Sequence, residues 1–104
     1  MKAADHIRNF VGKNEDKYSM YEGYSGRGMF GRKCLGVIVK EGNSCMEFMM
    51  DMTSYLAKMS ASDDGDFDLG FAEDMRYDNL GKDYIVYFPA IESRFRTAEN
   101  YDIK

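Results

Sequence analysis

Branched aliphatic side chains, histidine, cysteine and proline are all scarce in this chain of 104 residues. Leu, Ile and Val together number only 13, whereas Met, Tyr and Phe number 24. A chain of this length buries about two thirds of the surface that it exposes when unfolded, which is enough for a single core. We therefore expect one domain over residues 1–104, with a core built largely from Met and aromatic side chains.

The chain has no long apolar run and no cysteine motif, which disfavours several classes of protein. The longest nearly apolar run, residues 84–91, is too short for a membrane span and contains Pro89. No apolar run follows the first residues, so we expect no secretory signal. Cys34 and Cys45 have neither the spacing of metal ligands nor the density of a disulfide framework. The expected location is therefore the reducing cytoplasm, and the expected contacts include no membrane.

Groups for catalysis are equally few. His6 is the only histidine, and no Ser or Cys stands in a recognisable nucleophile motif. A spatial pairing of His6 with Cys34 or Cys45 is the remaining catalytic alternative. The acidic loop that contains Asp63, Asp64, Asp66 and Asp68 also fails as a calcium site, because taking Gly65 as the EF-hand glycine puts Phe71 where a glutamate is required. We expect a protein that is not an enzyme and that needs no cofactor or metal.

Charge is distributed unevenly along the chain. The net charge is −4, but residues 1–40 carry a balance of +4 and residues 41–104 carry a balance of −8. Affinity for nucleic acid comes from clustered Lys and Arg, so the acidic majority argues against direct nucleic-acid binding by the whole surface. The positive balance of residues 1–40 is compatible with a local anion-binding site in that part of the chain.

The pattern of apolar residues predicts an α+β fold with one main helix over residues 45–60. Ser44 and Glu47 form a capping box at its start. An apolar stripe recurs at helical spacing, made of Cys45, Phe48, Met49, Met52, Tyr55, Leu56 and Met59. Met46 and Met50 fall on the flank of this stripe, where they either pack at the rim of the core or offer a soft apolar patch to a partner.

Two β-hairpins are expected to form an antiparallel sheet on this helix. A strand over residues 17–24 puts Tyr18, Met20 and Tyr24 on one face and Tyr21 on the other, and it precedes a buried strand over 34–40. The second hairpin joins strands over 71–77 and 84–88 around a turn at 78–82, with 84–88 central in the sheet and Pro89 ending it.

A short helix is predicted at the start of the chain and a polar segment at its end. A short opening helix over residues 3–11 has Ile7, Phe10 and Val11 on one side, and Gly12 is expected to end it. Residues 92–104 are mixed and polar, which suits a short helix or a loosely ordered tail.

The glycines of residues 26–31, Gly-Arg-Gly-Met-Phe-Gly, match the spacing G-x-G-x-x-G. A dinucleotide-binding fold needs a helix after this motif, and here a strand follows, which excludes that fold. What remains is a loop in which cations and aromatic faces converge, able to hold a phosphate, a nucleobase or a protein. The candidate residues are Tyr21, Tyr24, Arg27, Met29, Phe30, Arg32 and Lys33. The alternative is a solvated hairpin whose glycines serve turn geometry.

A second candidate surface is acidic and follows the main helix. Its residues are Asp63, Asp64, Asp66, Asp68, Glu73 and Asp74. They suit docking to a basic surface, and the alternative is a solvated loop between helix and strand.

Together these patterns indicate a small acidic protein-binding module, an inhibitor of a basic nucleic-acid-handling protein. The format is similar to small orphan proteins of phages and mobile elements, some of which act against host defence, including CRISPR nucleases. The competing hypothesis is a small-ligand binder that captures a nucleotide or other anion at the loop of residues 26–31. Assembly into a homo-oligomer is a third possibility.

Overall fold

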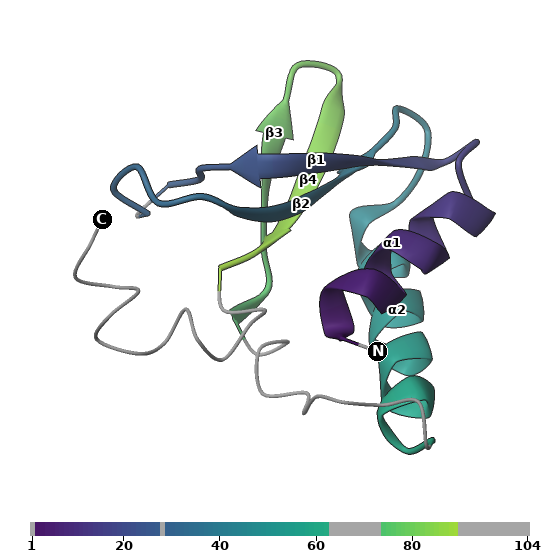
Figure 1. Ribbon diagram of the computed structural model, residues 1–104. Helices are drawn as coiled ribbons and strands as arrows, with labels where there is room; N and C mark the ends of the chain where they lie inside the picture. The colour runs from purple at the N-terminus through teal and green to yellow at the C-terminus, as the bar shows by residue number, and fades with distance from the viewer. Residues whose placement is uncertain (1, 28, 63–73, 90–104) are drawn as a thin grey trace.

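The computed structural model describes residues 2–27, 29–62 and 74–89. Four strands form one antiparallel sheet in the order β1-β2-β4-β3, so that β2 and β4 are central (Figure 1). The predicted α+β fold with two hairpins is confirmed. Along the chain the elements are α1 (Ala3–Lys13), β1 (Tyr18–Tyr24), β2 (Cys34–Val39), α2 (Cys45–Ser60), β3 (Arg76–Leu80) and β4 (Asp83–Phe88).

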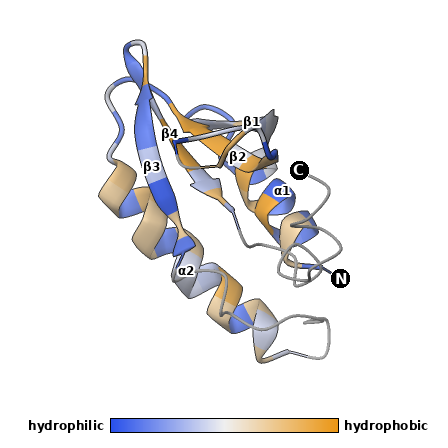
Figure 2. Cartoon of the chain, turned by 90° about the vertical axis from the view of Figure 1, so that its left-hand side faces the viewer, coloured by the Kyte–Doolittle hydropathy of each residue, from blue (hydrophilic) through white to orange (hydrophobic). Residues whose placement is uncertain are grey.

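Both helices pack on the same face of the sheet, which we call the helix face. Alternate residues of the central strands point toward them, because successive side chains of a strand lie on opposite faces. Figure 2 shows the hydrophobic character of β2 and β4 beside the hydrophilic edge strand β3. The innermost side chains of this core are Ile7, Val37, Val39, Phe48, Met52, Leu56, Val86 and Phe88, none of which is exposed.

The main helix has the predicted bounds, and the Ser44 half of the predicted capping box is formed. The Ser44 side chain accepts a hydrogen bond from the backbone N–H of Glu47 at 3.1 Å, which satisfies one of the amides that a helix start leaves unpaired. Met46 and Met50 are 68% and 63% exposed, so they do not pack at the rim of the core.

The opening helix is longer than predicted, because Gly12 does not end it. The helix continues to Lys13, and the cap residue Asn14 donates its backbone N–H to the Val11 carbonyl. The Asn14 side chain also donates to the Phe10 carbonyl at 2.9 Å. These two bonds satisfy carbonyls of the last turn, a role that glycine, which has no side chain, cannot fill as completely.

The predicted side of Tyr24 in the first hairpin is wrong. A β-bulge between Glu22 and Tyr24 shifts the register, with Gly23 at φ 80°. An extra residue in one strand moves all following side chains to the other face. Tyr24 therefore lies opposite Cys34 on the face that carries Tyr21, and away from the helices.

The second hairpin is tighter than predicted. Residues Asp78, Asn79 and Leu80 belong to β3, and only Gly81 and Lys82 form the turn. Gly81 has φ 67°, which suits a two-residue hairpin turn. β3 begins at Arg76, and residues 71–73 of the predicted strand, like the predicted tail at 92–104, lie outside the described residues. β4 is central and ends before Pro89, as predicted.

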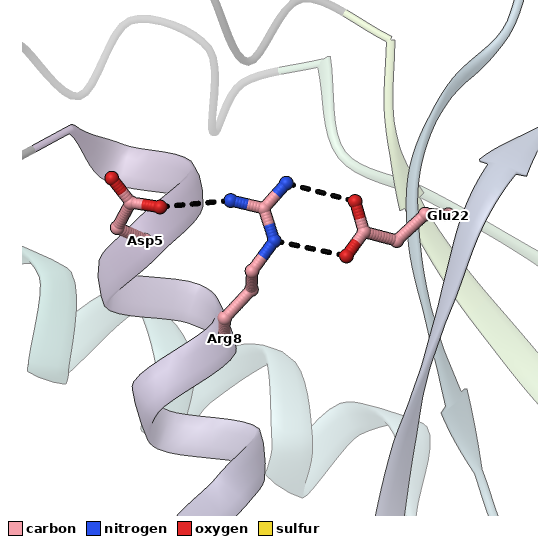
Figure 3. A network of polar contacts seen from close by, with 3 residues as sticks. All are labelled: Asp5, Arg8 and Glu22. Atoms are coloured by element: carbon pink, nitrogen blue, oxygen red, sulfur yellow. Dashed lines mark hydrogen bonds and ion pairs between the residues drawn. The ribbon is translucent and has the colours of Figure 1, made fainter.

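An ion-pair network fastens α1 to the edge strand β1 (Figure 3). The Arg8 guanidinium donates two hydrogen bonds to the Glu22 carboxylate, at 2.8 and 2.9 Å, and a third to Asp5 at 2.9 Å. The hydrogen bonds from Arg8 hold the pKa of Glu22 below its ordinary value. This network aligns the helix with the strand at the point where the bulge begins.

Removing this network is expected to have a small effect that depends on pH. Arg8→Met should lower the free energy of unfolding by at most about 1 kcal/mol at pH 7, because the carboxylates are half exposed. The pKa of Glu22 is lowered by folding, so its contribution is present above the ordinary pKa and is lost as pH falls through the lowered one. Urea unfolding at pH 7 and pH 3 measures this, with Lys58→Met on α2 as control. A difference that persisted at pH 3 would contradict the assignment.

No helix within the described ranges is both long enough and apolar enough to cross a bilayer.

Candidate functional site

The loop between β1 and β2 is built from two consecutive tight turns. The Gly26 carbonyl accepts from the Met29 N–H at 3.2 Å, and the Met29 carbonyl accepts from the Arg32 N–H at 3.0 Å. Phe30 and Gly31 are the central residues of the second turn, with φ of 54° and 85°. Positive φ at both central positions is the signature of a type I′ turn, which favours Asn-Gly. Phenylalanine at the first of them is held in a left-handed conformation that costs about 1–2 kcal/mol.

Met29 anchors this loop to the sheet and is only 2% exposed. Its sulfur accepts a hydrogen bond from the Gly26 N–H at 3.2 Å and a weak one from the Cys34 thiol at 3.8 Å. Together with Cys34 and Tyr87 it forms a second small core on the face opposite the helices, which we call the loop face. Its predicted part in a binding surface is therefore corrected: burial gives Met29 a structural role.

Gly26 packs directly on the ring of Tyr87. A Cβ at this position would lie 2.5 Å from two ring carbons, closer than side chains approach one another. The glycine is thus required by the contact between the loop and β4, and this requirement is separate from the turn geometry at Phe30.

Adding that methyl group is expected to detach the loop. Gly26→Ala should destabilise the protein by about 1–3 kcal/mol, because Tyr87 is buried and has little room to move. Gly12→Ala in α1 is the matched control, because a Cβ there meets nothing within 4 Å and the backbone φ is not positive. Chemical unfolding measures both variants. A Gly26→Ala protein as stable as the parent would contradict the packing of this loop.

Phe30 stands at the tip of the loop and is 88% exposed. It is more exposed than any other large hydrophobic side chain identified at the surface of the described residues, the next being Met46 at 68%. The residues on either side explain this position, because Met29 turns inward and Gly31 continues the left-handed turn.

Three tyrosines line the loop face beneath this tip. Tyr21 and Tyr24 meet edge to face with ring centroids 5.4 Å apart, and Tyr24 lies 5.0 Å from Tyr87. Burial raises the pKa of Tyr24, with the Asp78 carboxylate adding to the effect. Tyr21 is 40% exposed and presents its ring to solvent. The structure thus brings together the two tyrosines that were predicted to flank the loop.

The predicted cations lie around the same tip. The Arg27 side chain is 87% exposed and approaches the Asp78 carboxylate at 3.9 Å. Arg32 donates from Nε to the Met29 carbonyl at 3.1 Å, and Lys33 is exposed at the start of β2.

One further cation near the loop, Arg76, was not among the predicted site residues. It pairs with Tyr87 across β3 and β4, and it lies close enough to Cys34 for its charge, like that of Arg32, to favour the thiolate. Burial dominates, however, and raises the pKa of the Cys34 thiol to about 11. The thiol is therefore protonated at neutral pH and is a weak nucleophile. Only the register of the second hairpin could have indicated Arg76, because nothing in its local sequence points to the loop.

Of the six acidic candidate residues, the structure describes only Asp74. Asp63, Asp64, Asp66, Asp68 and Glu73 lie outside the described residues. Asp74 is about half exposed and pairs with Arg76 at 3.3 Å. Within the part of the chain that the structure describes, no group of three or more His, Cys, Asp or Glu side chains is placed to hold a metal ion.

The catalytic alternative finds no support at Cys34. His6 lies in α1, on the helix face, with its ring 6.3 Å from that of Tyr55 in α2. Cys34 belongs to the second core on the loop face, so the sheet separates the two side chains.

An open hollow of about 590 Å³ lies between the end of α1 and the edge strand β1. Its lining is balanced in charge, with Arg8 and Lys40 as cations and Glu15 and Asp16 as anions, and Lys40 donates to the Glu15 carbonyl at 2.7 Å. No ligand chemistry is favoured by this lining.

Comparisons with models of known protein families, with curated proteins and with solved structures find no match to this chain. Its function must therefore be argued from the residues themselves.

Proposed function

We propose that this protein is a non-catalytic protein-binding module whose contact is the tip of the β1–β2 loop. The observation that carries the proposal is Phe30, which is both 88% exposed and held at φ 54°. An exposed ring gains none of the free energy that burial of a phenylalanine provides, and the left-handed backbone adds a cost of its own. Both costs are offset if a partner buries the ring, and strained residues of this kind cluster at binding sites.

The loop is also suited to binding because it is held in place before the partner arrives. Met29 and Gly26 fix it to Cys34 and Tyr87, so little conformational entropy is lost when the tip is bound. Aromatic side chains on such supports are frequent centres of binding energy in protein interfaces.

The narrower prediction, an inhibitor of a basic nucleic-acid-handling protein of the phage or mobile-element type, depends on the acidic surface. Five of its six residues lie outside the described ranges, so that part stays a prediction. The same holds for the cytoplasmic location and for a homo-oligomer.

Position-specific crosslinking tests the proposed contact. The photoreactive amino acid p-benzoylphenylalanine replaces Phe30 in one variant and Tyr77, a 62% exposed residue of β3, in a matched control. In the cells that make this protein, we expect one discrete protein adduct from position 30 that is missing from position 77. Equal adducts from both positions, or none from position 30, would refute the proposal.

The competing hypothesis of a small-ligand binder is tested by thermal unfolding. Nucleotides and inorganic phosphate should leave the melting temperature unchanged if the loop serves a protein partner. A rise that disappears in Arg27→Ala would favour the small-ligand site instead.

A further inference from the structure

We infer that the partner surface receiving Phe30 is an acidic one: an apolar pocket bordered by carboxylates. This inference rests on the proposed function and concerns the chemistry of the partner. It also departs from the sequence-based expectation of a basic partner, which belongs to the acidic part of the chain.

The charges around the loop carry the inference. Four cations lie on the loop or on the strands beside it, and two of them pair with the carboxylates of Asp78 and Asp74. Among the described residues, the balance of these charges is therefore positive, on a protein whose net charge is −4. The cations are Arg27, Arg32, Lys33 and Arg76, and the carboxylates are those of Asp74 and Asp78.

The arrangement of the fold keeps this positive end separate from the acidic residues of α2. The loop projects from the end of the β1–β2 hairpin, on the left of Figure 1, whereas both helices lie on the right. The helix α2, which carries the exposed Glu47 and Asp51, therefore lies away from this loop. A partner that docks on the loop meets a ring bordered by cations, and a complementary surface is apolar at its centre and acidic at its rim.

A protein fits this surface better than a nucleic acid does. The chain as a whole is acidic, with an isoelectric point near 4.9, and so repels a polyanion at long range. Phe30 stands on a protruding turn that is suited to insertion into a pocket, and single-stranded nucleic acid is more often bound along a groove with several stacking rings.

Charge and ring should act on different rate constants. Cations at the rim of an interface steer the encounter, so they set the association rate, which falls as ionic strength rises. A buried aromatic anchor sets the dissociation rate. The inference thus predicts two separable kinetic signatures at one loop.

The experiment uses the full chain and the partner identified by crosslinking from position 30. The crosslinked partner peptide is mapped by mass spectrometry, and binding kinetics are then measured with the purified partner. The test variant is the double substitution Arg27→Glu and Lys33→Glu. The control is Lys58→Glu with Lys13→Glu, which makes the same change in charge on the two helices.

We expect the mapped peptide to be rich in Asp and Glu. The double variant should lower the association rate constant about tenfold or more at low salt, the control variant should lower it much less, and the difference should shrink at high salt. An unchanged or faster association of the double variant would overturn the inference, as would adducts with nucleic acid or binding of a dT20 oligonucleotide that the double variant abolishes. If a position-specific protein adduct forms but charge reversal has no effect, only the acidic partner is wrong. If no such adduct forms, the proposed function itself fails.

Discussion

Replacing Phe30 by asparagine is expected to stabilise the free protein while removing its binding to the partner. Asparagine is favoured at the first central position of a type I′ turn, which Phe30 occupies with φ 54°. Relief of the backbone strain should raise the free energy of unfolding by about 1 kcal/mol. Loss of an aromatic anchor typically costs 2 kcal/mol or more of binding free energy, so affinity should fall by about 30-fold or more.

Two further variants separate the ring from the turn. Phe30→Ala removes the ring but keeps a side chain in the left-handed conformation, so binding should be lost with little gain in stability. Phe30→Tyr keeps an aromatic ring of similar shape and should retain most of the binding. Urea unfolding and binding kinetics measure all three proteins. Full binding by Phe30→Asn would rule out the ring as the anchor, and a loss of stability would contradict the turn geometry.

Truncation of Phe48 is expected to remove much of the stability of the domain. The side chain has no exposed surface, and its ring lies 4.7 Å from Tyr18 and 6.1 Å from Phe10. Phe48→Ala leaves a cavity between α2, β1 and α1, for which the expected cost is about 3–5 kcal/mol. Small domains have only about 5–15 kcal/mol in total, so the variant should be partly unfolded at physiological temperature.

The matched control lies two residues earlier in the same helix. Met46 is 68% exposed, and Met46→Ala should change the free energy of unfolding by no more than about 0.5 kcal/mol. Chemical unfolding of the two variants compares the buried side of α2 with its exposed side. A cost below about 1 kcal/mol for Phe48→Ala would mean that this helix does not pack on the sheet through Phe48.

The fold was predicted most accurately where the deciding interactions are local. The bounds of α2 follow from Ser44, whose side chain caps the first turn, and from an apolar repeat within the helix. The central position of β4 follows from its apolar residues on both faces, and its end follows from Pro89. Each of these signals lies within a few residues of the element that it defines.

The errors occur where partners distant in the sequence decide. The register of β1 against β2 places the bulge at Gly23 and so turns Tyr24 to the loop face, which strand periodicity alone cannot show. The turn of the second hairpin contains only Gly81 and Lys82, because residues 78–80, which were predicted to lie in the turn, pair with residues of β4. The end of α1 is the exception, because a local partner decides it: Gly12 stays helical while Asn14, two residues later, donates to the carbonyls of the last turn.

The candidate site likewise has features set by the local sequence and features set by tertiary contacts. The sequence by itself determined that cations and aromatic residues are gathered in a glycine-rich hairpin loop, because these residues are neighbours along the chain. Only the tertiary structure decided that Met29 is buried, that Arg76 lies near Cys34 and that the ring of Phe30 is turned out to solvent. The physical reason is that the partners which bury Met29, Cys34 and Tyr87, are brought to it by the pairing of β2 with β4, which the local sequence does not specify.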